Sequence, residues 1–139
     1  MIVVDASVAF KWLKIKDEPY HNEAILILQE HLSDRNKILV PNILFIEIAN
    51  SLVTKTDTKD ATIRNDLKYL YGFHLEVKIP DESDIIEAAK LAKKNQTTAY
   101  DMLYAVIAQK HNTTLITADA RFVKKTKFPF TKLLSSYSL

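Results

Sequence analysis

The 139-residue chain contains no cysteine, which excludes disulfide bonds, thiolate zinc sites and cysteine nucleophiles. It has a single glycine, Gly72, whereas the P-loop and the dinucleotide-binding fingerprint each need at least two. Nucleotide hydrolysis by a P-loop and conventional NAD binding are therefore excluded. A chain without cysteine fits a reducing compartment, so we expect a cytoplasmic protein.

Long hydrophobic runs are also absent. The run 43–46 is stopped by Glu47, far short of the roughly 20 apolar residues that a membrane-spanning helix needs. The N-terminus lacks a basic leader and Asp5 interrupts its apolar run, so we expect neither a signal peptide nor membrane association. With 47% hydrophobic residues, 26% charged residues and a net charge of +2, the composition is that of a globular protein. The length predicts one domain over residues 1–139.

Short β-branched runs alternate with helical stretches, which predicts an α/β fold with a mainly parallel sheet. We expect strands at 2–4, 38–40, 75–79 and 114–117, and an edge strand within 128–134. We expect helices at 7–13, 22–32, 43–55, 59–71, 81–95 and 98–111, and a short one after Asp119. Gly72 would follow the helix 59–71 as its C′ residue. The apolar side of the helix 81–95 is expected to consist of Ile85, Ala88, Ala89, Leu91 and Ala92.

Acids follow the first strand and a late strand in closely similar sequence contexts. Asp5 ends the segment Ile2-Val3-Val4-Asp5, and Asp119 follows Leu115-Ile116-Thr117-Ala118. Open α/β sheets bind their ligands beyond the carboxyl ends of their strands, so both acids are expected at that edge. Glu47 and Asp101 lie on helices that would pack at the same edge. Such a gathering of carboxylates is tolerable at neutral pH only with hard cations, which favours a magnesium-dependent nuclease.

Each acid also has an ordinary structural explanation. Asp5 and Asp119 could be helix N-caps. The segment Thr98-Ala99-Tyr100-Asp101 has the form of a capping box, so Asp101 could serve the helix terminus alone. Glu47 falls on the polar side of its helix and could be a solvated surface side chain. The four positions are therefore informative only in combination.

Other polar residues near these acids are candidates for supporting roles. Asn50 lies one helical turn after Glu47, and Ser7 and Thr117 place hydroxyls beside Asp5 and Asp119, where they could orient the carboxylates or act as local caps. Basic side chains follow the acids and could contact phosphates or be ordinary solvated charges. These cations are Lys11, Lys14, Arg121, Lys124, Lys125 and Lys127.

Four segments of the chain, taken together, resemble the PIN-domain ribonucleases, and specifically the short toxins of the VapC type. The segments are Val3-Val4-Asp5-Ala6-Ser7, Pro41 followed by Glu47-Ile48-Ala49-Asn50-Ser51-Leu52, Thr98-Ala99-Tyr100-Asp101-Met102-Leu103-Tyr104-Ala105 and Leu115-Ile116-Thr117-Ala118-Asp119-Ala120-Arg121-Phe122. They occur in the family's order, with similar spacing, across nearly the whole chain. The segment 56–78 matches no motif of the family.

The resemblance implies a three-layer α/β/α sandwich around a parallel sheet. It implies a Mg²⁺ or Mn²⁺ site formed by Asp5, Glu47, Asp101 and Asp119, in which Asp5 and Asp101 are expected to be direct ligands. It further implies a homodimer held inactive by a small antitoxin protein. On this reading Asp5, Asp101 and Asp119 hold the ions, Glu47 binds a second ion or positions the attacking water, and RNA is hydrolysed.

The alternatives to this function are other phosphate-handling domains, a metal-free ribonuclease and a binding module. A phosphatase with an aspartyl nucleophile needs a second acid two residues after the first, but Ser7 stands there, and a phosphoacceptor domain needs an acid where the chain has Val40-Pro41-Asn42. A metal-free ribonuclease would use histidines as acid and base. The chain has four of them, namely His21, His31, His74 and His111. A PIN-fold module that binds RNA or protein without cleavage is the non-enzymatic alternative.

Overall fold

A computed structural model describes residues 1–13, 17–54 and 59–138 of the chain. Its centre is a parallel sheet of five strands in the order β3-β2-β1-β4-β5. The strands are β1 (Ile2–Val4), β2 (Ile38–Pro41), β3 (Glu76–Lys78), β4 (Thr114–Thr117) and β5 (Thr131–Leu133). The helices are α1 (Ala6–Leu13), α2 (His21–Leu32), α3 (Ile43–Thr54), α4 (Asp60–Gly72), α5 (Glu82–Asn95), α6 (Ala99–Lys110), α7 (Ala120–Thr126) and the 3₁₀ helix η1 (Leu134–Ser136).

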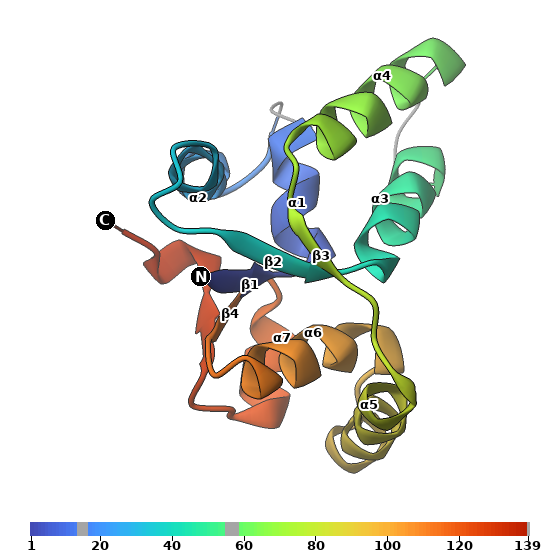
Figure 1. Ribbon diagram of the computed structural model, residues 1–139, viewed down its shortest axis with the longest axis vertical. Helices are drawn as coiled ribbons and strands as arrows, with labels where there is room; N and C mark the ends of the chain where they lie inside the picture. Colours follow the sequence, from blue (N-terminus) through green and yellow to red (C-terminus); the bar gives the residue numbers. More distant parts are fainter. Residues whose placement is uncertain (14–16, 55–58, 139) are drawn as a thin grey trace.

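The elements form three layers, as the resemblance implied. Helices α1 to α4 lie on one face of the sheet, and α5, α6 and α7 lie on the other (Figure 1). The chain moves outward from β1 through β2 to β3 and then returns to β4, which pairs with β1 on its other side. The helix after β1 and the helix after β4 therefore cover opposite faces. Such a topological switch point leaves a crevice at the carboxyl ends of the two strands.

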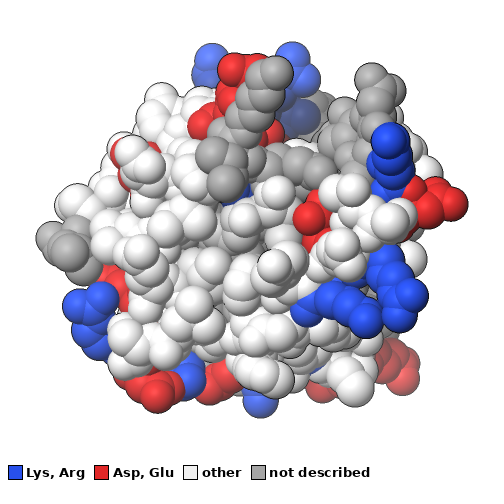
Figure 2. Space-filling model, turned by 90° about the horizontal axis from the view of Figure 1, so that it is seen from above, with Lys and Arg blue, Asp and Glu red and all other residues white. Residues whose placement is uncertain are grey.

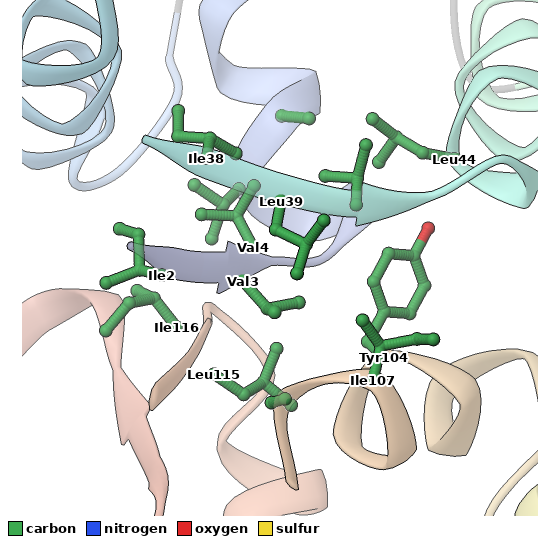
Figure 3. Packing of buried hydrophobic residues seen from close by; sticks show 14 of the residues in the cluster. Ile2, Val3, Val4, Ile38, Leu39, Leu44, Tyr104, Ile107, Leu115 and Ile116 are labelled. Carbon is green, nitrogen blue, oxygen red and sulfur yellow. The ribbon is translucent and has the colours of Figure 1, made fainter. Parts of the chain in front are cut away.

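The core explains why the central strands are continuous apolar runs. Val3 and Val4 of β1 are fully buried, because β1 is covered on both faces. Their register places Val3 beside Leu39 of β2 and Leu115 of β4. Helix α6 packs against β1, β2 and β4 and is buried along most of its length (Figure 3). The position of α6 under the switch point brings its first turn to the carboxyl edge of the sheet.

The predicted elements are confirmed in type and order, including the edge strand β5, but two details were wrong. Gly72 is the last residue of α4 and has no positive φ; the left-handed residue after α4 is His74, with a φ of 52°. Ile85 is 56% exposed, and Ala89 is exposed as well. The buried side of α5 instead includes Asp84, because its carboxylate accepts from the Asp81 backbone N–H and pairs with a lysine of α6.

The face formed by the upper helical layer carries little charge at its centre. Figure 2 shows uncharged atoms over most of this face and charged side chains toward its margin. Tyr69 and Tyr71 of α4 are 66% and 60% exposed. The described residues of this face therefore form no concentrated basic surface for RNA. Separately, no helix in the described part of the chain is long and apolar enough to cross a membrane.

Candidate metal centre at the carboxyl edge of the sheet

Asp5 follows β1 and is held by bonds from two parts of the chain. Its Oδ1 accepts from the backbone N–H of Ser7 at 3.1 Å, from the Ser7 hydroxyl at 2.5 Å and from the Val8 N–H at 3.3 Å. Its Oδ2 accepts from the hydroxyl of Thr117 at the end of β4. Asp5 therefore caps α1, and it also joins the two strands at the switch point.

Ser7 and Thr117 complete a network across the crevice. The Ser7 hydroxyl accepts from the Ala118 N–H at 2.9 Å, and the Thr117 hydroxyl accepts from the Asp119 N–H at 3.0 Å. Thr117 is fully buried. Because these bonds connect residues more than 100 positions apart, the role of the two hydroxyls goes beyond local capping. They fix the orientation of the Asp5 carboxylate.

Burial raises the pKa of Asp5 from 3.8 to about 6. Hydrogen bonds from Ser7, Thr117 and the Val8 backbone oppose this rise, and the negative charge of Asp101 adds to it. A carboxylate with these properties gains from a nearby cation, because a positive charge would offset both the burial and the repulsion.

Asp101 lies in the first turn of α6, close to Asp119. The Thr98 hydroxyl caps α6 by accepting from the Asp101 N–H at 3.1 Å. Among the described residues, a return bond from the Thr98 backbone N–H to the Asp101 carboxylate is not found, so the full capping box does not form; α5 has one, between Asp81 and Asp84. Burial raises the pKa of Asp101, a hydrogen bond with the Thr98 side chain lowers it, and the charge of Asp119 raises it.

Asp119 keeps the local role that its sequence suggested. Its Oδ1 accepts from the Phe122 N–H at 3.1 Å and caps α7. Because its charge also raises the pKa of Asp101, Asp119 belongs to the same electrostatic group. The structure thus links Asp5 to Asp101 and Asp101 to Asp119.

Glu47 reaches this group through Tyr104, a residue that the sequence reading missed. Tyr104 is 1% exposed, and its hydroxyl donates to Glu47 Oε1 at 2.6 Å. The Tyr104 ring extends from α6 toward β2 and the start of α3 (Figure 3). Its pKa is raised far above the usual value by burial and by the charges of Glu47, Asp5 and Asp101. Glu47 is therefore a half-buried, held side chain and not a freely solvated one. The sequence signal for Tyr104 was its position three residues after Asp101, on the same side of a largely apolar helix.

Two cavities meet at Asp101. The larger, which we call the acidic cavity, has a volume of about 470 Å³ and is lined by Ala6, Ser7, Phe10, Glu18, Glu47, Asn50, Ser51 and Asp101. The smaller, which we call the α7 cavity, has a volume of about 320 Å³ and is lined by Gln96, Thr97, Thr98, Asp101, Asp119, Arg121, Phe122 and Lys125. The cavities thus bring together Glu47, Asn50, Ser7 and Asp101 on one side and Asp119 and Arg121 on the other.

The donor set fits a hydrated hard cation better than a closed cage. In the described part of the chain, no three His, Asp or Glu residues are close enough to hold one ion between them. The four acids therefore do not share one ready-made coordination sphere. Mg²⁺ does not need one, because it usually keeps several waters and is bound through one or two carboxylates and substrate phosphates. Asp5 and Asp101, which repel each other and are partly removed from water, are suitable for this purpose.

The basic side chains expected to contact phosphates differ in where they lie. Lys11 is only 6% exposed and its Nζ lies 2.9 Å from Glu18 Oε2, so the expected phosphate contact by Lys11 is not supported. Lys14 lies outside the described residues. Arg121 lines the α7 cavity, whereas Lys124 is exposed but lines neither cavity.

The histidines do not form an acid–base pair in either cavity. His31 is 2% exposed, its Nδ1 accepts from the Ile38 N–H at 3.0 Å, and its Nε2 donates to the Phe73 carbonyl at 3.0 Å. It therefore holds β2 and the end of α4 together. None of the four histidines lines the acidic cavity or the α7 cavity.

The fold and the site together define a class: a three-layer parallel α/β protein with interacting carboxylates at the switch point of its sheet. The chain belongs to the PIN-domain family, whose model matches residues 2–127. Proteins of this family are generally nucleases. A comparison with curated protein sequences gives no significant match.

Solved structures of similar fold include one that is described as a toxin. PAE2754 from Pyrobaculum aerophilum has a TM-score of 0.72 at 20% identity, over 97% of this chain and 91% of its own. The sarcin-ricin loop cleaving toxin VapC20 of Mycobacterium tuberculosis has a TM-score of 0.67 at 12% identity, over 89% and 94%. FitAcB from Neisseria gonorrhoeae has a TM-score of 0.65 at 15% identity, over 99% and 100%. At these identities the likeness establishes the fold.

Proposed function

We propose that this chain is a metal-dependent endoribonuclease that acts as a single PIN domain over residues 1–139. The observation that carries the proposal is the electrostatic linkage at the switch point. Burial raises the pKa of Asp5 and of Asp101. The charge of Asp101 adds to the rise at Asp5, and the charge of Asp119 adds to the rise at Asp101. A family of nucleases and a cluster of mutually repelling, partly buried carboxylates together favour phosphodiester hydrolysis assisted by a divalent cation.

Asp5, Asp101 and Asp119, with Glu47, are the residues that would hold Mg²⁺, or Mn²⁺ in its place. The chemistry that such an ion supplies is activation of a water and neutralisation of charge on the phosphate. Ser7 and Thr117 would keep the Asp5 carboxylate oriented through the bonds described above.

Glu47 is proposed to position the attacking water. It lines the acidic cavity opposite the first turn of α6, and the Tyr104 hydroxyl fixes one of its oxygens. A carboxylate held in this way accepts a hydrogen bond from water in a defined direction. Asn50, exposed on the same wall one turn later, would donate from its amide to a phosphate oxygen.

We further propose that the protein is the toxin of a toxin–antitoxin pair. VapC20, described as a sarcin-ricin loop cleaving toxin, and FitAcB have the same fold and nearly the same extent. By analogy, the cellular form would be a cytoplasmic homodimer bound by an antitoxin protein. Co-expression with a neighbouring small gene product, followed by co-purification and release of RNA cleavage on its removal, would test this part.

The decisive test of the nuclease proposal is RNA cleavage by the purified protein in Mg²⁺, in excess chelator, and after Asp5→Asn or Asp101→Asn. We expect cleavage in Mg²⁺ that leaves 5′-phosphate ends and that chelator and both substitutions abolish. Glu87→Gln is the matched control, because Glu87 is an exposed acid of α5 that lines neither cavity. Cleavage that persists in chelator would refute the metal-dependent mechanism.

One observation favours a second candidate, a PIN-fold module that binds RNA or protein without cleaving. Three acids close enough to hold an ion are not found among residues 1–13, 17–54 and 59–138. If RNA binds to the protein but remains intact in both Mg²⁺ and Mn²⁺, this candidate replaces the nuclease.

A further inference from the structure

The two cavities on either side of Asp101 differ in charge. The described residues that line the acidic cavity include Glu18, Glu47 and Asp101 but no lysine or arginine. The α7 cavity is lined by Arg121 and Lys125 in addition to its acids. Because Asp101 belongs to both walls, a ligand bound at the acids can reach into either hollow.

Among the described residues, neither cation of the α7 cavity forms an ion pair with a carboxylate. Arg121 makes no ion pair with any residue that the structure describes. The Lys125 ammonium donates to the Gln96 carbonyl at 2.8 Å, which holds it in place without cancelling its charge. Gln96 ends α5 in the left-handed conformation, with a φ of 56°, and so presents that carbonyl. One lysine is thus anchored at the cavity wall, next to an arginine that pairs with no carboxylate in the described part of the chain.

We propose that the α7 cavity is the subsite for the phosphate adjacent to the cleaved one in a single-stranded RNA. This inference rests on the nuclease proposed above. A strand whose scissile phosphate lies at Asp101 carries a further phosphate on each side. Only the α7 side offers cations among the described residues, and Arg121 can bind two phosphate oxygens at once while Lys125 adds a point charge. The subsite therefore sets the direction in which the strand is held.

The subsite distinguishes two adjacent lysines of one helix. Lys124 and Lys125 carry the same charge and are both exposed, yet only Lys125 lines the cavity. Successive residues of a helix point about 100° apart, which accounts for the difference. The sequence offers both lysines as phosphate contacts, and the subsite uses Lys125 and not Lys124.

Steady-state kinetics with a fluorescent single-stranded RNA test the subsite. We expect Arg121→Gln and Lys125→Gln each to raise KM about fivefold to tenfold, with kcat within about twofold of the unsubstituted protein. Each should also reduce the slope of log KM against log salt concentration by about 0.7, the value for one phosphate contact on a single strand. Lys124→Gln is the matched control and should change neither quantity.

The position of the contact is tested with the unsubstituted protein and RNAs that carry one uncharged methylphosphonate linkage. Neutralising the flanking linkage on one side of the cut should raise KM, and this effect should be smaller in Lys125→Gln, because only Arg121 then contacts that phosphate. Equal effects on both sides, or equal effects of Lys124→Gln and Lys125→Gln, would overturn the subsite while the metal-dependent cleavage stands. No cleavage of any RNA in Mg²⁺ would overturn the nuclease proposal and the subsite with it.

Discussion

Replacing Tyr104 with phenylalanine removes one hydroxyl from the core and leaves the ring that packs there. The lost interaction is the 2.6 Å hydrogen bond to Glu47 Oε1, made by a side chain that is 1% exposed. A hydrogen bond to a charged group is worth roughly 1.5–3 kcal/mol, but Glu47 is half-buried beside a cavity where water can take the place of the hydroxyl. We therefore expect a loss of about 1 kcal/mol of unfolding free energy, or about 2–4 °C in Tm.

The effect on catalysis should exceed the effect on stability. If Glu47 positions the attacking water, loss of the Tyr104 hydrogen bond to its Oε1 should lower kcat about tenfold to a hundredfold while KM for RNA stays within about twofold. The exposed Tyr100 of the same helix makes no side-chain hydrogen bond with the described residues, so Tyr100→Phe is the matched control. It should leave both kcat and Tm unchanged.

A double-mutant cycle separates positioning from a general disturbance of the core. In a Glu47→Gln background, which already removes the carboxylate, Tyr104→Phe should cause little further loss of kcat. A full additional loss would show that Tyr104 acts by another route. An unchanged kcat in the single Tyr104→Phe variant would refute the assignment to Glu47 altogether.

Three further predictions follow from buried polar groups. Because the pKa of Asp5 rises from 3.8 to about 6 on folding, the folded state binds this proton more tightly than the unfolded state. The metal-free protein should therefore lose stability as pH rises from about 4 to about 6. Asp5→Asn should flatten that part of a Tm-versus-pH curve. If the curve is the same in both proteins, the buried acid does not behave as described. Lys11→Met removes the partner of Glu18 and should lower the unfolding free energy in a urea melt by about 1–2 kcal/mol, without changing the salt dependence of RNA binding. A weaker dependence of RNA binding on salt would show that Lys11 contacts phosphate. His31→Leu removes the imidazole that bonds the Ile38 N–H and the Phe73 carbonyl and should cost about 2–4 kcal/mol of unfolding free energy. The fraction that folds should still cleave RNA normally and leave 5′-phosphate ends. Loss of activity in a folded variant would instead support a histidine mechanism.

The sequence was sufficient for the sheet because its signals are local. Runs such as Ile2–Val4 and Thr114–Thr117 are short, apolar and followed by acids, and both strands lie where those runs predict. The gathering of Asp5, Asp101 and Asp119 also follows from the order of elements, since parallel strands end at one edge. The caps formed by Asp5 and Asp119 were likewise predictable from residue type and position.

Side-chain contacts between distant elements were not predictable in the same way. The bond between Tyr104 and Glu47 depends on how α6 lies against α3, which no local pattern records. Burial of Lys11 depends on Glu18, beyond the end of its own helix. The inward face of α5 likewise depends on its contact with α6: Asp84 is buried and pairs with Lys110 of α6, whereas Ile85 is exposed.

The central claim is that acids distant in the sequence bind a divalent ion together, and Mn²⁺ titration followed by water-proton relaxation tests it most directly. We predict saturable binding to the unsubstituted protein, competition by Mg²⁺, and at least a tenfold weaker affinity, about 1.4 kcal/mol, in both Asp5→Asn and Asp101→Asn. Equal binding by the unsubstituted protein and these two variants, or no binding by any of them, would contradict the account.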